Sequence, residues 1–316
     1  MSMSSTNPTL ARDGGILDRL SATFWRRPGL LLLLMLTPPL LWLGIIYIGS
    51  LFALLAQSLF SLDDFTGQVK YELTLSTYKE LFRQSNIDII IRTVTMAAMV
   101  TIASAIIAFP IAYYAARYAK GRWKALFYLG AMLPLWSSYL VKIYAWKMIL
   151  AKEGIISWFF DKIGLTWLLD AYLSLPVVGG NSLSISYTGT FLVFVYVWLP
   201  YMILPVQAAL ERVPGNLIEA SYDLGGSPGQ TFRHVIFPLA LPGIIAGSIF
   251  TFSLTLGDYI IPGIIGSSRL FIGQAVYTQQ GTAGNIPLAA AFSVVPIIIM
   301  AFYLWAAKRK GAFDAL

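Results

Sequence analysis

Long apolar segments separated by shorter polar ones make up most of the chain. A helix needs about 20 mostly apolar residues to cross a hydrocarbon core about 30 Å thick. Six segments are long enough, and they cover about residues 29–59, 90–116, 125–150, 187–210, 239–262 and 287–307. The pattern predicts an all-α fold, a polytopic membrane protein with six transmembrane helices.

Two of these segments carry features that are unusual in a span. The first contains Pro38 and Pro39, which we expect to kink its helix because proline lacks the backbone N–H. The third contains Lys142 and Lys147 and is the least conventional of the six, because charged side chains within a membrane are costly.

The composition agrees with a membrane protein. The 316 residues are 57% hydrophobic and 12% charged, whereas a soluble domain carries about 25% charged residues. With no cysteine, disulfides and thiolate metal sites are excluded. The single histidine, His234, argues against a histidine-based metal centre, and we expect it to cap a helix or face solvent.

The charge distribution predicts the orientation of the chain. An even number of spans places both termini on one side, where the short loop of residues 117–124 carries four basic residues and no acidic one. With the two tails and residues 211–238, this side holds 13 of the 22 basic residues and 6 of the 15 acidic ones. The positive-inside rule makes this side, and both termini, cytoplasmic. The charge of +7 thus reflects topology, and because no aromatic-basic groove accompanies it, we expect no nucleic-acid partner.

Three segments outside the spans have predicted structures of their own. Residues 1–28 form a cytoplasmic tail without a signal-peptide pattern, in which GILDRLSATFWRRPG is compatible with a surface helix placing Trp25 among the headgroups. On the other side, residues 60–88 contain TLSTYKELF, whose Ser or Thr followed by Glu predicts a capped surface helix. Residues 151–186 are too often interrupted for a span and predict a helix along the interface or across the end of the bundle.

A polar segment at residues 211–238 separates the fourth and fifth spans. Its first half, PGNLIEASYDLG, has a proline start signal and a Gly-Gly stop signal at residues 225–226. Its second half, SPGQTFRHVIF, begins with Ser227 as a cap and Pro228 at the first helical position. The segment therefore predicts a helical hairpin that projects into the cytoplasm.

Two alternatives for this segment are a phosphate-binding loop and an ordinary turn. The stretch GGSPGQT has Gln230 where such a loop needs lysine, and it follows a membrane span rather than a strand. The first predicted helix also has an apolar side flanked by carboxylates, which suits insertion into a partner's groove. The apolar side consists of Leu217, Ile218 and Tyr222, and the carboxylates are those of Glu219 and Asp223.

The hairpin resembles the EAA signature of the membrane subunits of type I ATP-binding-cassette importers. That signature reads EAA, three residues, G, nine residues and I-x-LP. The chain matches this spacing throughout, at Glu219-Ala220-Ser221, Gly225, Val235 and Phe237-Pro238. Three residue types differ from the signature: serine replaces the second alanine, valine replaces isoleucine and phenylalanine replaces leucine. The resemblance covers about residues 30–310, and residues 134–150 and 253–273 are similar to permeases of the spermidine/putrescine branch.

This resemblance implies a permease domain at residues 29–310, with residues 211–238 as its coupling segment. The residues that dock on the ATPase would be Glu219, Ala220 and Ser221, with Asp223 beside them. Gly225 would provide a sharp turn, and Pro238 would start the fifth span. The chain would be a transport subunit and no enzyme, with no cofactor of its own, because it has no Walker lysine. ATP and Mg would bind to a dimer of partner ATPase subunits. A second, homologous permease and an extracytoplasmic substrate-binding protein would complete the assembly in the lipid bilayer of a bacterial inner membrane.

A solute pathway is predicted at the outer ends of the spans. Asp258 would contribute negative potential for a cationic solute, and aromatic faces for ammonium groups would come from Trp136, Tyr139, Tyr144 and Trp146. The alternatives are that Lys142 pairs with Asp258 or extends to the interface, and that the aromatic residues form an interfacial belt. Because an unpaired Lys142 would repel cations, a polyamine solute rests mainly on the resemblance.

Other functions remain as alternatives to polyamine import. An importer of the same family could carry an amino acid derivative or an anion. A stand-alone secondary transporter would need inverted repeats, and none is convincing between residues 30–150 and 187–307. A membrane enzyme would need a nucleophile and a base, and the spans contain no such pair. The sequence GIIAG at residues 243–247 allows close helix packing within the chain, between subunits or against lipid, and has no assigned role.

Overall fold

The computed structural model describes residues 28–63, 65–175 and 178–309. The predicted surface helix around Trp25 and the end of the C-terminal tail lie outside these residues. The chain forms two units that divide between Ala56 and Gln57, and each is considered separately below.

The first unit is one long apolar helix. It begins as α2 (Pro28–Leu41), continues through a π-helical segment (Trp42–Ile48) and ends as α3 (Gly49–Gln57). The π-helical segment follows directly after Pro38 and Pro39, whose missing N–H groups interrupt the regular hydrogen bonding. Its large apolar side chains are exposed on all sides, as expected of a helix whose solvent is lipid.

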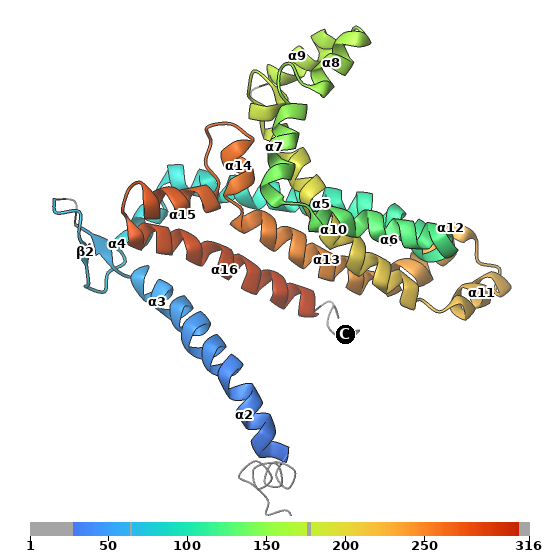
Figure 1. Cartoon of the computed structure of the whole chain (residues 1–316), viewed down its shortest axis with the longest axis horizontal. Helices are drawn as coiled ribbons and strands as arrows, with labels where there is room; N and C mark the ends of the chain where they lie inside the picture. Colours follow the sequence, from blue (N-terminus) through green and yellow to red (C-terminus); the bar gives the residue numbers. More distant parts are fainter. Residues whose placement is uncertain (1–27, 64, 176–177, 310–316) are drawn as a thin grey trace, which may run out of the picture. The chain divides into compact units, whose positions relative to one another are not determined.

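Three long helices form the centre of the second unit. They are α5 (Gln84–Arg117), α10 (Tyr187–Arg212) and α13 (Phe237–Gly257), and each contacts the other two (Figure 1). The last long helix, α16 (Ile286–Arg309), packs on α13 and on the shorter α15 (Ile272–Gly281).

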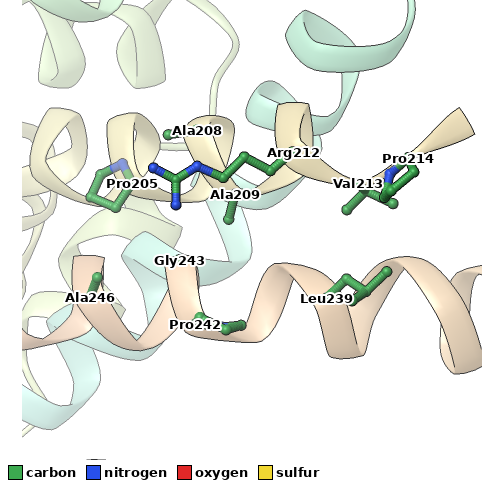
Figure 2. Close-up of a pocket in the computed structure, with 10 residues that line it drawn as sticks. All are labelled: Pro205, Ala208, Ala209, Arg212, Val213, Pro214, Leu239, Pro242, Gly243 and Ala246. Carbon is green, nitrogen blue, oxygen red and sulfur yellow. The ribbon is translucent and has the colours of Figure 1, made fainter. Parts of the chain in front are cut away.

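Small residues bring α10 and α13 close together. Gly243 lies on the side of α13 that faces α10 (Figure 2), and a Cβ atom on Gly247 would lie 2.7 Å from the sulfur of Met202. Packing of this kind matters in a membrane, where lipid is as apolar as a side chain and close van der Waals contact drives helix association. The GIIAG stretch thus serves packing within the chain.

The number of membrane-spanning helices agrees with the prediction. Among the described residues, five helices are long and apolar enough to span a membrane, and they are Leu31–Gln57, Gln84–Arg117, Tyr187–Arg212, Pro228–Gly257 and Ile286–Arg309. A sixth span results if α6 (Gly121–Trp136) and α7 (Tyr139–Ile149) count as one. These two helices are bent by 96°, so a continuous helix over residues 125–150 is wrong.

The break between α6 and α7 has a local cause. Ser137 and Ser138 are extended, with ψ of 147° and 131°. Pro134 lacks an N–H one turn before the end of α6, which weakens its last turn. The Lys142 ammonium then donates to the Pro134 carbonyl over 2.7 Å and satisfies a carbonyl that the broken helix leaves free.

The connection of residues 60–88 contains the predicted surface helix and two strands that the sequence did not predict. The helix is α4 (Ser76–Leu81). Its predicted side-chain cap is wrong, because Leu75 occupies the capping position, while the Thr77 hydroxyl donates to the Phe60 carbonyl. Strands β1 (Ser61–Leu62) and β2 (Val69–Lys70) pair antiparallel, with Ser61 opposite Lys70. This two-stranded ribbon is a small addition to a helical fold.

Residues 151–186 are partly helical, as predicted, but they contain two short helices where the sequence predicted one, and their place along the interface or across the end of the bundle stays a prediction. They contain α8 (Ile155–Lys162), α9 (Thr166–Leu173) and a 3₁₀ turn at Leu183–Ile185. All three are too short to cross a membrane.

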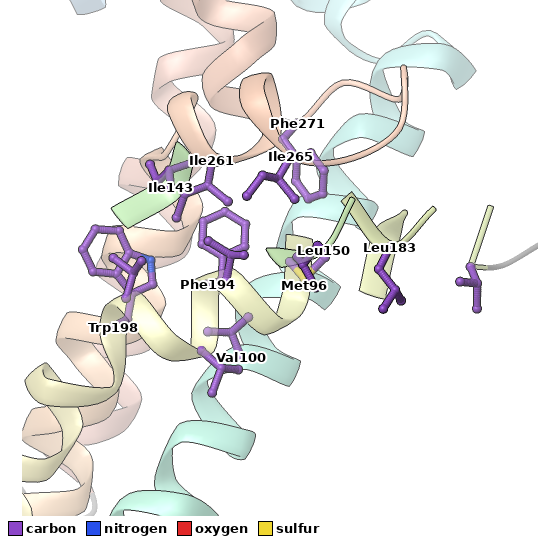
Figure 3. Packing of buried hydrophobic residues seen from close by; sticks show 14 of the residues in the cluster. Met96, Val100, Ile143, Leu150, Leu183, Phe194, Trp198, Ile261, Ile265 and Phe271 are labelled. Atoms are coloured by element: carbon purple, nitrogen blue, oxygen red, sulfur yellow. The ribbon is translucent and has the colours of Figure 1, made fainter. Parts of the chain in front are cut away.

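The largest apolar cluster joins the bent helix to the centre of the bundle. Figure 3 shows Phe194 of α10 beside Ile261 and Ile265, and Ile143 of α7 and Met96 of α5 belong to the same cluster. Ile143, within α7, and Leu150, which follows its last residue, are both fully buried. The bend in the third span therefore places α7 against α10 and against α14 (Ile260–Ile264).

Candidate functional site

The polar segment between α10 and α13 forms the predicted helical hairpin. Its first arm is α11 (Gly215–Asp223), which begins after Pro214. Leu224 ends the helix, and Gly225 follows with φ of +79°, a conformation that favours glycine. The proline start and glycine stop are thus confirmed.

The second arm begins with the predicted cap and then departs from the prediction. The Ser227 hydroxyl accepts from the Gln230 N–H, and the Gln230 side chain accepts from the Ser227 N–H over 2.8 Å. The helix runs from α12 (Pro228–Thr231) through a π-helical segment (Phe232–Ile236) directly into α13. Pro238 therefore lies in the first turn of α13, but it does not start a new helix. The π-helical segment lies where Pro238 provides no N–H for the regular bond to the preceding turn.

The predicted docking residues differ in their exposure. Glu219, Ala220, Asp223 and Gly225 are exposed. The Ser221 hydroxyl lies 2.9 Å from the hydroxyl of Thr231, which is fully buried, so Ser221 joins the two arms of the hairpin. The sequence could not show this bond, because it connects residues on either side of the turn.

The apolar side of α11 is divided between the bundle and the surface. Ile218 packs against a buried cluster that includes Ala112 of α5 and Leu210 of α10, whereas Leu217 and Tyr222 are exposed. Leu224 is 89% exposed. A groove of about 360 Å³ beside it is lined by Leu217, Ala220, Leu224 and His234, among others. Leu224 was missed in the sequence because it follows the last residue of α11, although its spacing of seven residues from Leu217 was a usable signal.

Two polar contacts hold the base of the hairpin. The Arg117 guanidinium, at the end of α5, donates to the carbonyl of the buried Val213 over 2.8 Å. One Glu211 oxygen lies 2.9 Å from the Lys124 ammonium, and the other accepts from the Tyr128 hydroxyl over 2.7 Å. The ends of α5, α6 and α10 therefore meet where the hairpin begins. From the sequence, the charges of these residues indicated topology alone.

At the opposite end of the bundle, the Asp258 carboxylate is already bonded. One oxygen accepts from the N–H groups of Ile260 (2.7 Å) and Ile261 (3.0 Å), the first residues of α14, and the other accepts from the Tyr139 hydroxyl. Asp258 follows the last residue of α13 and is extended, so the predicted helix to residue 262 is wrong. The carboxylate thus satisfies two N–H groups at the start of α14, which would otherwise lack a partner once the helix is broken.

The structure separates the other residues of the predicted solute pathway. Within the described residues Lys142 bonds to Pro134 and not to Asp258, so these two charges do not pair. Tyr139 stacks on Trp198 with ring centroids 5.8 Å apart. Trp146 instead packs on Tyr196 of α10, and Trp136 and Tyr144 are exposed. Only Tyr139, of the four predicted aromatic residues, contacts Asp258.

A bundle of apolar helices with a polar helical hairpin between its fourth and fifth spans defines a multi-pass membrane permease. The chain belongs to the family of binding-protein-dependent transport system inner membrane components, whose model matches residues 108–310. It is therefore a permease subunit of an ATP-binding-cassette importer, a multi-pass protein of a bacterial inner membrane.

Two curated relatives extend this comparison. The chain is 60% identical over 300 residues to the inner membrane ABC transporter permease protein YdcU of Escherichia coli (strain K12), covering 95% of this chain and 96% of that protein. It is 29% identical to the spermidine/putrescine transport system permease protein PotB of the same organism, over 85% of this chain and 94% of that one.

Solved structures support the fold. A bacterial alginate ABC transporter, crystallised with a periplasmic protein bound to an alginate pentasaccharide, contains a chain that matches with a TM-score of 0.67. The sequence identity is 17%, and the match covers 92% of this chain and 98% of that one. A chain of the MetNI methionine ABC transporter matches with a TM-score of 0.53 and 18% identity, over 73% of this chain and 96% of the other.

Proposed function

We propose that this importer permease passes a polyamine, spermidine or putrescine, from an extracytoplasmic binding protein to the cytoplasm. The supporting observation for the solute is the relationship to PotB over 85% of the chain. ATP would be hydrolysed, with Mg, on a dimer of partner ATPase subunits, and a second, homologous permease would complete the pathway. These partners are of the kinds with which ATP-binding-cassette importers assemble.

In this proposal the hairpin is where the ATPase acts on the permease. Glu219 and Asp223 are exposed carboxylates on α11 with the small, exposed Ala220 between them, and Leu224 is an apolar residue beside them that a partner could bury. Displacement of α11 would reach α5 through the Arg117 to Val213 bond and α6 through Glu211. Gly225 provides the turn, and Ser221 keeps the two arms together so that they move as one.

The solute would meet the outer end of the bundle near α7 and α14. There the Asp258 carboxylate contacts α7 of the bent third span, through Tyr139. Trp136 and Tyr144 present exposed aromatic faces on either side of the break between α6 and α7. These faces suit ammonium groups. Import of an anion or an amino acid derivative by the same machinery is the second candidate, and it gains support from the fact that the Asp258 carboxylate already accepts three hydrogen bonds from within the chain.

Transport by the reconstituted complex tests the proposal. The chain is placed in proteoliposomes with its partner ATPase, second permease and binding protein, and ATP-dependent uptake of labelled spermidine is compared with uptake of amino acids and anions. We expect saturable spermidine uptake that stops when Glu219→Lys disrupts docking. Uptake by this chain alone without ATP would contradict the coupling role, and preference for an anion would contradict the polyamine assignment alone.

A further inference from the structure

The break between α6 and α7 leaves two polar groups of the third span in need of partners. In a continuous helix the Pro134 carbonyl would accept from the Ser138 N–H four residues on, but α6 ends at Trp136 and Ser138 is extended. Lys142 is a cation within the same span and has no carboxylate partner among the described residues. An unpaired charge or a free carbonyl within a membrane is costly. Each group is therefore a suitable partner for the other.

The two groups bond to each other across the break. The Lys142 ammonium donates to the Pro134 carbonyl over 2.7 Å, and the Ser137 hydroxyl donates to the same oxygen over 2.9 Å. The carbonyl thus uses both of its lone pairs. The bond from Lys142 joins residues eight positions apart and ties the first turn of α7 to the last turn of α6.

This bond is specific to the bent form of the span. In a continuous helix Lys142 would lie about 12 Å along the axis from Pro134, too far for its side chain to reach back to the carbonyl. The carbonyl would also be occupied by the Ser138 N–H. A bond that exists in only one of two conformations shifts the equilibrium toward that conformation. Lys142 therefore favours the bend.

A second bond from the same turn depends on this bend. Tyr139 precedes Lys142 by three residues, so both lie on the same side of α7. The Tyr139 hydroxyl donates to the carboxylate of Asp258, at the end of α13, and the Tyr139 ring stacks on Trp198 of α10. The first turn of α7 thus makes one bond to α6 and another to the outer end of α13.

We propose that Lys142 is a positioning residue of the transport pathway, which holds the third span in its bent form and so keeps Tyr139 at Asp258. Lys142 acts through the geometry of α7 and not as a charge that contacts the solute. Its effect on the bend does not depend on which solute is carried. Its effect on uptake rests on the proposed function, in which the solute meets the bundle near α7 and α14.

Distance measurements between two spin labels test the effect on the bend. The chain contains no cysteine, so Leu129→Cys in α6 and Met148→Cys in α7 introduce its only two thiols, both at exposed positions. These positions would be about 28 Å apart in a continuous helix, and the 96° bend brings them closer together. Double electron–electron resonance on the full chain in lipid nanodiscs should give a single short distance.

Variants of two lysines separate the bond from a general effect of charge. Lys142→Met removes the donor and should add a population at longer distance, because loss of a hydrogen bond to a charged group shifts the equilibrium about tenfold or more. Lys142→Arg keeps a charged donor and should retain the short distance. Lys147→Met removes an exposed cation from the same helix and should leave the distance unchanged. An unchanged distribution in Lys142→Met, or an equal change in Lys147→Met, would overturn the proposal.

Uptake by the reconstituted complex distinguishes a positioning role from a direct one. If Lys142 positions α7, Lys142→Met should lower the maximal rate of spermidine uptake several-fold without lowering the KM, and Lys142→Arg should retain most of the rate. If the charge instead repels a cationic solute, Lys142→Met should lower the KM. A lower KM with an unchanged maximal rate would therefore overturn the positioning role. The distance measurements involve no solute, so a wrong polyamine assignment would leave their outcome unchanged.

Discussion

The Lys124 ammonium lies 2.9 Å from the Glu211 carboxylate and joins the start of α6 to the last turn of α10. The two residues are 87 positions apart in the sequence. The second carboxylate oxygen is bonded to Tyr128, also in α6. Because Val213 and the hairpin follow at once, the position of the third span is linked to the hairpin.

Exchange of these two charges tests the link. Lys124→Glu should lower spermidine uptake per ATP hydrolysed in the reconstituted complex, and adding Glu211→Lys should restore much of it because the attraction returns. Thermal stability should change little, since an exposed ion pair contributes ~0–1 kcal/mol. Arg122→Glu changes the loop charge by the same amount, and Arg122 has no ion-pair partner among the described residues. An equal loss of uptake there would contradict a specific link.

Arg117 is predicted to transmit movement of the hairpin to α5. Arg117→Ala removes the bond to the Val213 carbonyl, and hydrogen bonds to charged groups contribute ~1.5–3 kcal/mol. Uptake per ATP hydrolysed should fall about tenfold or more, while ATPase activity continues. The measurement is the ratio of the two rates, with Arg122→Ala as control. Parallel loss of both rates would indicate misfolding or failed assembly instead.

Gly225 should tolerate a side chain poorly. Its φ of +79° lies in the left-handed region, where a non-glycine residue costs ~1–2 kcal/mol. Gly225→Ala should lower the midpoint of thermal unfolding of the purified chain, whereas Gly229→Ala should not, because Gly229 lies in α12 with open space around it. Equal midpoints for the two variants would refute the strained turn.

Ser221 should act in the hairpin rather than in docking. Ser221→Ala restores the alanine of the EAA signature and removes the bond to Thr231, so it should lower the free energy of unfolding by ~1 kcal/mol and leave binding of the ATPase intact. Thr231→Ala should have a similar effect on stability, and the double variant should cost less than the sum. Loss of ATPase binding in Ser221→Ala alone would show direct docking.

The roles of Asp258 and Tyr139 can be separated. Asp258→Asn removes the charge but keeps an acceptor for α14, whereas Tyr139→Phe removes one bond and keeps the charge. If Asp258 attracts a cationic solute, Asp258→Asn should raise the KM for spermidine several-fold and Tyr139→Phe should not. An unchanged KM for spermidine in Asp258→Asn would mean that the carboxylate only stabilises the start of α14 and does not attract the solute.

Much of this protein follows from local features of its sequence. The apolar segments required helices because a bilayer offers no hydrogen bonds to an open backbone. Pro214, Gly225 and the pair Ser227 and Gln230 determined where the hairpin helices begin and end, through contacts within a few residues. For the same reason the EAA spacing was recognisable without a structure.

The tertiary structure decided which of these residues face one another. The 96° bend at Ser137 and Ser138 brought Tyr139 to Asp258 and left Trp136 and Tyr144 exposed. The inward bond of Ser221 and the division of the apolar side of α11 likewise depend on neighbouring helices. Local propensities and periodicity act over a few residues, whereas these contacts join segments that are distant in the sequence, and the packing of the whole bundle determines them.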